Sequence, residues 1–437
     1  MINKGQELYK KAKKLIPGGT MLFSKNPDNF LPDRWPTYFS KAKGKNIWDL
    51  DGNMLKDMSL MGVGTNVLGY SNKEIDSFII NKAKLGNLST LNCPEEVLLA
   101  EKLIEINPWA HMVRFSRTGG EANAIAIRIA RAASGRDKVA ICGYHGWHDW
   151  YLSINHNTVY DNLSDHLMHG INSTGVPKYL KDSVFPFEYN NFEMLEKITS
   201  ENDIGVIKME VQRNFPPTDN FLKKVRSLAS KKNIVLIFDE CSSGFRETFG
   251  GLYNKHDIEP DLVIFGKTLG NGYAITAVVG KKDIMGAARN SFISSTFWTE
   301  RIGPSAAIKT LELMEKLESW NTITDLGNLM RNKWKQVSDN NNIKLEINGI
   351  PALSTYNFIH KDNLKFKTFI TQEFLKKDIL ATSQFYPSIC HNERDINQYA
   401  EIFNDLLFQI KKCVDGEKSI DELLEVKSVR SGFKRFN

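Results

Sequence analysis

Several features that define other protein classes are missing from this sequence. No apolar run approaches the roughly 20 residues that a membrane-spanning helix needs. The five cysteines are dispersed over 437 residues and no pair has the C-x-x-C spacing, so neither a disulfide framework nor a structural zinc site is expected. With 30 Gly and 14 Pro, the chain is neither collagen-like nor of low complexity. Neither a long apolar segment nor a small-residue cleavage site follows the Lys-rich N-terminus, so we expect no signal peptide and a cytoplasmic protein.

The composition that remains is typical of a globular protein. Hydrophobic residues make up 41% of the chain and charged residues 25%, which excludes disorder as the main state and allows one large core and a second, smaller one. The net charge of +6 comes from lysines that are scattered along the chain and clustered at both ends. This pattern favours a solvated surface over a nucleic-acid-binding stripe. We therefore expect small-molecule partners, and neither nucleic acid nor membrane.

The pattern of apolar residues divides the chain into segments 1–60, 61–320 and 321–437. In the middle segment, short continuous apolar runs alternate with helical patterns, as in a parallel sheet that helices cover on both faces. The predicted strands are residues 112–115, 138–142, 205–210, 234–239 and 261–265, and the predicted helices are residues 94–106, 122–133 and 221–231. The last segment resembles a smaller α/β lobe. The sequence thus predicts an α/β fold with a large and a small domain.

Ligands of open α/β sheets bind beyond the carboxyl ends of the strands, so residues that follow predicted strands are the candidate functional residues. The strand 112–115 is followed by Ser116-Arg-Thr-Gly-Gly-Glu-Ala122, a Gly turn that opens a helix. A hydroxyl group and the backbone N–H groups of a helix start form an anion site that suits a phosphate. The alternative is an ordinary strand-to-helix turn.

An acid and an amine end two later strands. Asp239 closes the run 234–239, where its carboxylate stays ionised only beside a positive partner such as a protonated pyridine nitrogen. The alternative is an Asp that caps the following turn. Lys267 follows the run 261–265, where desolvation lowers its pKa so that the neutral amine can form a Schiff base. The alternative is a Lys that binds a phosphate or a carboxylate.

The segment Gly143-Tyr-His-Gly-Trp-His148 follows the strand 138–142. Its aromatic side chains can stack on a flat ring. His145 and His148 are three residues apart, but no metal site is expected, because no third ligand has a suitable spacing and His166 and His169 lie in a different polar loop.

Together, these segments match one cofactor. A phosphate turn, an acid for a ring nitrogen, an aromatic side chain for a ring face and an amine for an aldehyde are what pyridoxal 5'-phosphate (PLP) requires. Each signal alone is weak evidence for PLP, but their order along one alternating α/β chain is strong evidence for it. The sequence therefore predicts PLP as the cofactor.

The same segments resemble those of the class III aminotransferases, which are fold-type I PLP enzymes, and most closely the glutamate-1-semialdehyde 2,1-aminomutases. Asp239-Glu-Cys-Ser-Ser-Gly-Phe-Arg246 is similar to the family's Asp-Glu-Val-x-x-Gly-Phe-Arg, and Phe265-Gly-Lys267 is similar to its Schiff-base lysine segment. The resemblance covers nearly the whole chain. It implies a large domain with a mostly parallel seven-stranded sheet and a small α/β domain made from the N- and C-terminal segments.

The resemblance also implies residue roles. Lys267 would hold the cofactor and shuttle a proton, and Asp239 would keep the ring nitrogen protonated. Tyr144 and Cys241 would lie against the two ring faces. A homodimer with shared active sites is implied, because in this family a Thr from the second subunit completes the phosphate site. The other cofactor-binding residues would be Thr118, Gly119, Gly120, His145, Glu210, Asn214 and, as that Thr, Thr296.

Departures from the family fall on the substrate side. The aminomutases have an Arg that grips the substrate carboxylate where this chain has Lys25, and Lys is not a bidentate replacement. Arg213 stands where small residues are usual, and the segment of Trp298 replaces a Gly-Thr-Leu-Ser-Gly-Asn-Pro motif. Lys25, Arg213 and Trp298 are therefore the expected substrate residues.

Because the cofactor residues are retained and the substrate residues are changed, the sequence favours an aminotransferase. An amino donor such as glutamate would pass its amine through pyridoxamine phosphate to a keto or aldehyde acceptor, for instance a keto-sugar. One alternative is an aminomutase that makes 5-aminolevulinate from glutamate-1-semialdehyde. Another is a catalytically inactive PLP-fold binding protein, against which the retention of both Lys267 and Asp239 argues.

Overall fold

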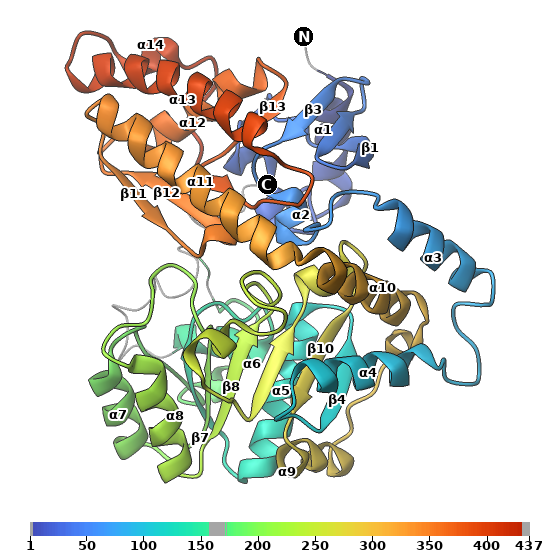
Figure 1. The fold of residues 1–437 in the computed structure, drawn as a ribbon. Helices are drawn as coiled ribbons and strands as arrows, with labels where there is room; N and C mark the ends of the chain where they lie inside the picture. Colours follow the sequence, from blue (N-terminus) through green and yellow to red (C-terminus); the bar gives the residue numbers. More distant parts are fainter. Residues whose placement is uncertain (1–2, 157–170, 172, 431–437) are drawn as a thin grey trace. The chain divides into compact units, whose positions relative to one another are not determined.

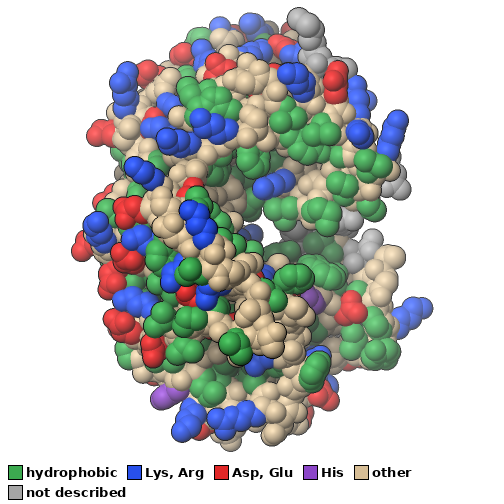
Figure 2. All heavy atoms as spheres, turned by 90° about the vertical axis from the view of Figure 1, so that its right-hand side faces the viewer, with side chains coloured by type: hydrophobic (Ala, Val, Ile, Leu, Met, Phe, Trp, Pro, Cys, Tyr) green, Lys and Arg blue, Asp and Glu red, His purple; other side chains and the backbone are tan. Residues whose placement is uncertain are grey.

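The computed structural model of the chain describes residues 3–156, 171 and 173–430. The chain divides into two compact units, one of residues 73–320 and one that joins residues 1–72 to residues 321–437 (Figure 1). Among the described residues, no helix is both long and apolar enough to cross a membrane. On the face shown in Figure 2, Lys and Arg side chains are interspersed with Asp and Glu, as expected for a solvated surface.

The unit of residues 73–320 is built around a seven-stranded sheet with the order β4-β10-β9-β8-β7-β5-β6. Neighbouring strands from β6 to β9 are parallel, and β10 is antiparallel to both β9 and β4. The mostly parallel α/β architecture predicted from the sequence is therefore confirmed. The strands are β4 (Met112–Ser116), β5 (Lys138–Cys142), β6 (Val184–Pro186), β7 (Ile204–Met209), β8 (Val235–Glu240), β9 (Leu262–Phe265) and β10 (Thr276–Gly280).

Helix α5 (Gly119–Ser134) covers the centre of this sheet. It packs against β4 and β7 to β10 because its Ala and Ile side chains recur at helical spacing on one face. Thr118 and Glu121 form a capping box at its start, and Gly135, with φ 67°, ends it. The other helices of this unit are α3 (Lys73–Ala83), α4 (Glu95–Ile106), α6 (Asp149–Leu152), α7 (Phe192–Glu201), α8 (Phe221–Lys231), α9 (Lys282–Met285) and α10 (Ile302–Leu317).

The other unit joins the two ends of the chain. Strand β3 (Met54–Asp57) pairs in parallel with β13 (Ile379–Leu380), so the N-terminal and C-terminal segments share one sheet of order β1-β2-β3-β13. The remaining strands are β1 (Phe39–Lys43), β2 (Asn46–Asp49), β11 (Leu345–Asn348), β12 (Ser354–Phe358) and β14 (Gln384–Phe385). The helices are α1 (Lys4–Leu15), α2 (Met61–Gly64), α11 (Ser319–Asn340), α12 (Asn363–Leu375), α13 (Glu393–Val414) and α14 (Ile420–Leu423).

Aromatic side chains form the core of this second unit. The rings of Tyr356 in β12 and Phe403 in α13 lie 5.5 Å apart, and Phe403 also lies 5.7 Å from Tyr399. Phe403 is fully buried in this cluster, whereas Phe408 on the same helix is 52% exposed.

Replacement of Phe403 by Ala is expected to lower the free energy of unfolding by about 3–5 kcal/mol, because it leaves a cavity among packed aromatic rings. Chemical denaturation followed by circular dichroism measures the change. Phe408→Ala is the matched control and should lower it by less than about 1 kcal/mol. Equal losses in the two variants would contradict the burial assigned to Phe403.

Candidate active site

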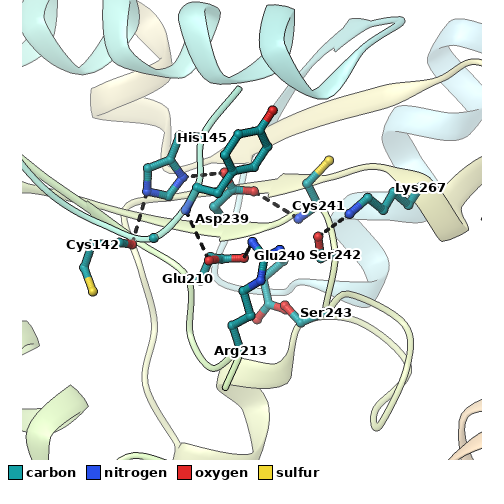
Figure 3. Close-up of polar contacts among 12 residues, drawn as sticks. Cys142, His145, Glu210, Arg213, Asp239, Glu240, Cys241, Ser242, Ser243 and Lys267 are labelled. Carbon is teal, nitrogen blue, oxygen red and sulfur yellow. Dashed lines mark hydrogen bonds and ion pairs between the residues drawn. The ribbon is translucent and has the colours of Figure 1, made fainter. Parts of the chain in front are cut away.

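The carboxyl ends of the parallel strands β5, β7, β8 and β9 lie along one edge of the seven-stranded sheet. Side chains that end these strands therefore meet in one place. His145 follows β5, Glu210 follows β7, Asp239 lies near the end of β8 and Lys267 follows β9. Figure 3 shows these four side chains in one cluster.

Asp239 is buried, with 4% of its surface exposed, and is surrounded by donors. Its Oδ2 accepts hydrogen bonds from His145 Nδ1 (2.8 Å) and Lys208 Nζ (3.2 Å), and its Oδ1 accepts one from the Cys241 N–H (3.1 Å). Burial by itself would raise the pKa of Asp239. The charge of Lys208 and the contact with His145 outweigh burial and hold this pKa far below its ordinary value. Asp239 is therefore an ionised acceptor.

Glu240, the next residue in β8, takes no part in this arrangement because side chains alternate along a strand. Its carboxylate accepts hydrogen bonds from Ser243 Oγ (2.5 Å) and from the Tyr253 N–H (3.1 Å). Burial raises the pKa of Glu240 to about 7. Of the two adjacent acids, Asp239 alone contacts His145 and Lys208.

His145 is fully buried and connects Asp239 to the end of β5. Its Nε2 faces the Cys142 carbonyl oxygen at 3.2 Å, and its Nδ1 faces Asp239. Burial lowers the pKa of His145, and the charge of Lys208 lowers it further. The lowered pKa favours the neutral ring, which donates a hydrogen bond to Asp239 Oδ2 when its proton is on Nδ1. His145 holds Asp239 in place.

Lys208 belongs to the cluster although the sequence analysis did not select it. It lies within β7, and its side chain is fully buried. The sequence pattern predicts an apolar strand over residues 205–210, and of these residues only Glu210 is an expected cofactor residue. The signal that could have revealed Lys208 is a single basic residue inside that run, which needs a buried acid on a neighbouring strand.

Lys267 lies directly beyond β9, with its backbone in the left-handed region at φ 27°. Its side chain is half-buried, and Nζ donates a hydrogen bond to Ser242 Oγ at 2.5 Å. Burial lowers the pKa of Lys267 below that of a solvated lysine, while Cys241 opposes the shift. A lowered pKa increases the share of neutral amine, which is the form that attacks a carbonyl.

The turn before α5 has the geometry of an anion site. Glu121 Oε2 accepts hydrogen bonds from the N–H groups of Arg117 (3.0 Å) and Thr118 (2.9 Å). The first intrahelical bond runs from the Ala122 N–H to the Thr118 carbonyl oxygen, so the N–H groups of Gly119 and Gly120 lie ahead of the helical bonding pattern. They are available to a phosphate at the positive end of the helix.

The two glycines of this turn allow a close approach. A Cβ atom on Gly119 would lie 2.9 Å from Cys241 Sγ, and one on Gly120 would lie 2.8 Å from the His148 ring. Within the described part of the chain, the buried His148 Nδ1 has no hydrogen-bond partner. A small cradle with N–H groups and an unpartnered ring nitrogen beside it fits the phosphate of PLP.

Glu210 connects the aromatic segment to Arg213. Its Oε2 accepts a hydrogen bond from the Tyr144 N–H (3.3 Å), and its Oε1 lies 3.4 Å from Arg213 Nη1. The side chain of Arg213 is half exposed, and Tyr144 is 38% exposed. Tyr144 and Arg213 are therefore tied to the cluster through one carboxylate.

The other residues selected from the sequence lie in different settings. Trp298 donates from Nε1 to Glu121 Oε1 (3.3 Å), which places it against the first turn of α5. Asn214 and Thr296 are exposed, in the loop after β7 and in a short 3-10 helix (Thr296–Thr299). Lys25 is exposed and belongs to the other unit. The roles of these four residues stay predictions.

Metal ligands are not clustered in the part of the chain that the structure describes: it contains no group of three or more His, Cys, Asp or Glu side chains placed to hold a metal ion. His166 and His169 lie outside the described residues.

Comparison with known proteins gives consistent matches over most of the chain. The family model of the class III aminotransferases matches residues 32–407. The 3-aminobutyryl-CoA aminotransferase of Cloacimonas acidaminovorans is 32% identical over 430 residues, which cover 94% of this chain and 98% of that protein. A glutamate-1-semialdehyde 2,1-aminomutase of Methanosphaera stadtmanae is 31% identical over 389 residues, which cover 86% of this chain and 88% of that protein.

Solved structures share the fold. The FumI protein of Sphingopyxis sp. MTA144, in its PLP internal aldimine form, superposes with a TM-score of 0.83 at 23% identity and covers 96% of this chain and 100% of that chain. An omega-transaminase from Sphaerobacter thermophilus superposes with a TM-score of 0.80 at 20% identity, with 94% and 98% covered. The fold-type I architecture expected from the sequence is confirmed.

Gly120→Ala is expected to weaken the binding of PLP by roughly tenfold or more, about 1.4 kcal/mol, because the new methyl group would displace His148 from the phosphate turn. Fluorescence titration of the apoprotein measures the dissociation constant. Gly286→Ala is the control, since a Cβ atom there meets nothing within 4 Å. Pyridoxal, which has no phosphate, should bind both variants alike; an equal loss for pyridoxal would argue against a phosphate at this turn.

Proposed function

The chain belongs to the class III aminotransferase family of PLP-dependent enzymes, and we propose that it transfers an amino group from a donor such as glutamate to a keto or aldehyde acceptor. The observation that carries this proposal is the placement of a half-buried amine, Lys267, one strand away from an ionised buried acid, Asp239. The amine can attach to the aldehyde of a pyridine aldehyde, and the acid can bind its ring nitrogen.

PLP supplies an aldehyde that condenses with amines and an aromatic ring that delocalises negative charge from the substrate carbon. In our proposal, Asp239 would bind the ring nitrogen, Thr118, Gly119 and Gly120 would hold the phosphate, and Lys267 would be the covalent attachment point. Tyr144 and Cys241 would lie against the ring faces. A second subunit would contribute Thr296, which makes a homodimer part of the proposal.

Lys267 performs two tasks in this mechanism. Its neutral amine would hold PLP covalently at the aldehyde carbon, with loss of water, until the donor amine takes its place. The freed Nζ would then act as the general base and acid that moves a proton between the donor carbon and the cofactor. Ser242 Oγ, at 2.5 Å, accepts a hydrogen bond from this amine and would orient it for both tasks. The lowered pKa of Lys267 serves both tasks, since each begins with the neutral amine.

Arg213 supports the recognition of an anionic substrate. Its guanidinium is half exposed and is oriented by Glu210, which also fixes the Tyr144 backbone. A guanidinium can bind a substrate carboxylate in two-point fashion. Trp298, which contacts Glu121 in the first turn of α5, and Lys25 are the other proposed substrate residues.

Two further substrate assignments come from the relatives. Near full-length similarity to a 3-aminobutyryl-CoA aminotransferase makes the corresponding 3-oxoacyl thioester an acceptor to test beside keto-sugars. Similarity to the aminomutases favours, as a second candidate function, the conversion of glutamate-1-semialdehyde to 5-aminolevulinate. The replacement of the aminomutase Arg by Lys25 argues against this second candidate.

Lys267→Ala is expected to abolish covalent attachment of PLP. After borohydride reduction, peptide mapping of the wild type should place the cofactor on the peptide that contains Lys267 and leave the peptide of Lys208 unlabelled. Lys178→Ala, which removes an exposed lysine, is the control and should be labelled like the wild type. Labelling of another lysine in the wild type would refute the assigned role of Lys267.

A single-turnover experiment tests the transfer itself. Mixing the holoenzyme with glutamate should release one equivalent of 2-oxoglutarate per site and leave the transferred amine on the extracted cofactor. Alanine and 4-aminobutyrate serve as alternative donors. If no donor gives its keto product, the aminotransferase proposal fails; if glutamate-1-semialdehyde alone turns over and yields 5-aminolevulinate, the aminomutase replaces it.

A further inference from the structure

Lys208 places a charged side chain where the sheet is otherwise apolar. Its partners across the neighbouring strands are Ile141 in β5 and Ile237 in β8, and the residue on its own strand that shares its face is Val206. These three residues belong to the hydrophobic cluster that packs against α5. Lys208 itself has no exposed surface. Its ammonium group is therefore removed from water and needs a partner inside the protein.

Asp239 is the group that partners Lys208. Lys208 Nζ lies 3.2 Å from Asp239 Oδ2. Asp239 follows Ile237, the residue on β8 that pairs with Lys208, by two positions and so lies nearer the carboxyl edge of the sheet. The other titratable groups that face this position are Cys241, Glu210 and His145, whose ring donates to the same Oδ2. Burying an unpaired ammonium is strongly unfavourable, and the contact with Asp239 compensates for the burial of Lys208.

The contacts that Asp239 makes with described residues leave room for one more donor. A carboxylate offers about four acceptor positions. His145 and Lys208 occupy those of Oδ2, and the Cys241 N–H occupies one of Oδ1. The last position, on Oδ1, is where a ring N–H can bind.

Without the cofactor, the negative charge of Asp239 is already balanced by the positive charge of Lys208, whereas its hydrogen-bond positions are not all occupied by described residues. The carboxylate of Asp239 is paired with the amine of Lys208, whose pKa is lowered by burial while the charge of Asp239 opposes that shift. Burial also lowers the pKa of His145, which favours its neutral form. A protonated ring nitrogen would add a second positive charge against the same carboxylate. Two like charges that share one counter-charge in a buried site disfavour each other.

We propose that Lys208 is a positioning residue that shares the charge of Asp239 with the cofactor ring nitrogen and thereby weakens the hold of that nitrogen on its proton. The proposal rests on the proposed function, because it takes Asp239 as the partner of the ring. Lys208 sets how strongly the ring withdraws electrons, although it lies behind Asp239 and not against the ring.

The test is a pH titration of the holoenzyme loaded with PLP that carries ¹⁵N in the ring, since the ¹⁵N chemical shift reports the protonation of that nitrogen. The wild type, Lys208→Met and Lys208→Arg are compared. The midpoint should rise by about one pH unit or more, a tenfold change, in Lys208→Met, and Lys208→Arg should stay close to the wild type. His145, Cys241 and Glu210 are unchanged in both variants, so they do not account for a difference.

Equal midpoints in the wild type and Lys208→Met would overturn the proposal, even if the variant is less stable, because a purely structural role leaves the midpoint unchanged. Should Lys208→Met not fold, Lys208→Gln gives the same comparison with a neutral side chain that still donates to Asp239. A wild-type ring nitrogen that keeps its proton over the whole pH range in which the protein is folded would overturn the proposal without any variant.

Failure of this inference is separable from failure of the proposed function. If borohydride labels Lys267 and the ¹⁵N midpoint does not respond to Lys208, the cofactor assignment stands and the role of Lys208 falls. If Lys267 is not labelled, the proposed function fails first.

Discussion

The buried carboxylate of Asp239 is the interaction on which the rest of the site depends. A negative charge taken out of water at the end of β8 is tolerated only where donors surround it. Lys208, His145 and the Cys241 N–H supply those donors from β7, from the segment after β5 and from the turn after β8. They keep the carboxylate ionised and fix its direction. The site is therefore organised around an acceptor that is in place before any ligand binds.

The order of the strands explains why distant residues reach this carboxylate. Strands β5, β7, β8 and β9 are parallel neighbours, so His145, Glu210, Asp239 and Lys267 leave the sheet at the same edge. The antiparallel strand β10 lies between β9 and β4, and α5 follows β4 and packs back over the same sheet. Its glycine turn thereby reaches Cys241, at the end of β8. One sheet thus brings an anion site, an acid and an amine together.

Local sequence signals predicted the long elements and the residues that end them. Residues 138–142, 234–239 and 261–265 each contain at least four consecutive apolar residues, and each segment lies within one residue of the observed strand bounds. Strand β6 was missed because it has three residues and ends in Pro186, and β10 was missed because a short apolar run after a Gly-rich loop has no periodicity to separate it from a turn. Both strands are defined by pairing with neighbours and not by their own pattern.

The sequence by itself determined which chemical groups lie at the ends of the strands. The glycine turn, Asp239 and Lys267 can be predicted from the sequence because strand, turn and helix signals are local. Only the tertiary structure decided that Asp239, and not Glu240, contacts Lys208 and His145, and that Trp298 meets Glu121. The physical reason is that these contacts join side chains that lie far apart in the chain, on different strands and loops. The packing of the whole sheet places β7 beside β8. Lys208, a basic residue within an apolar run, thereby becomes the counter-charge of Asp239.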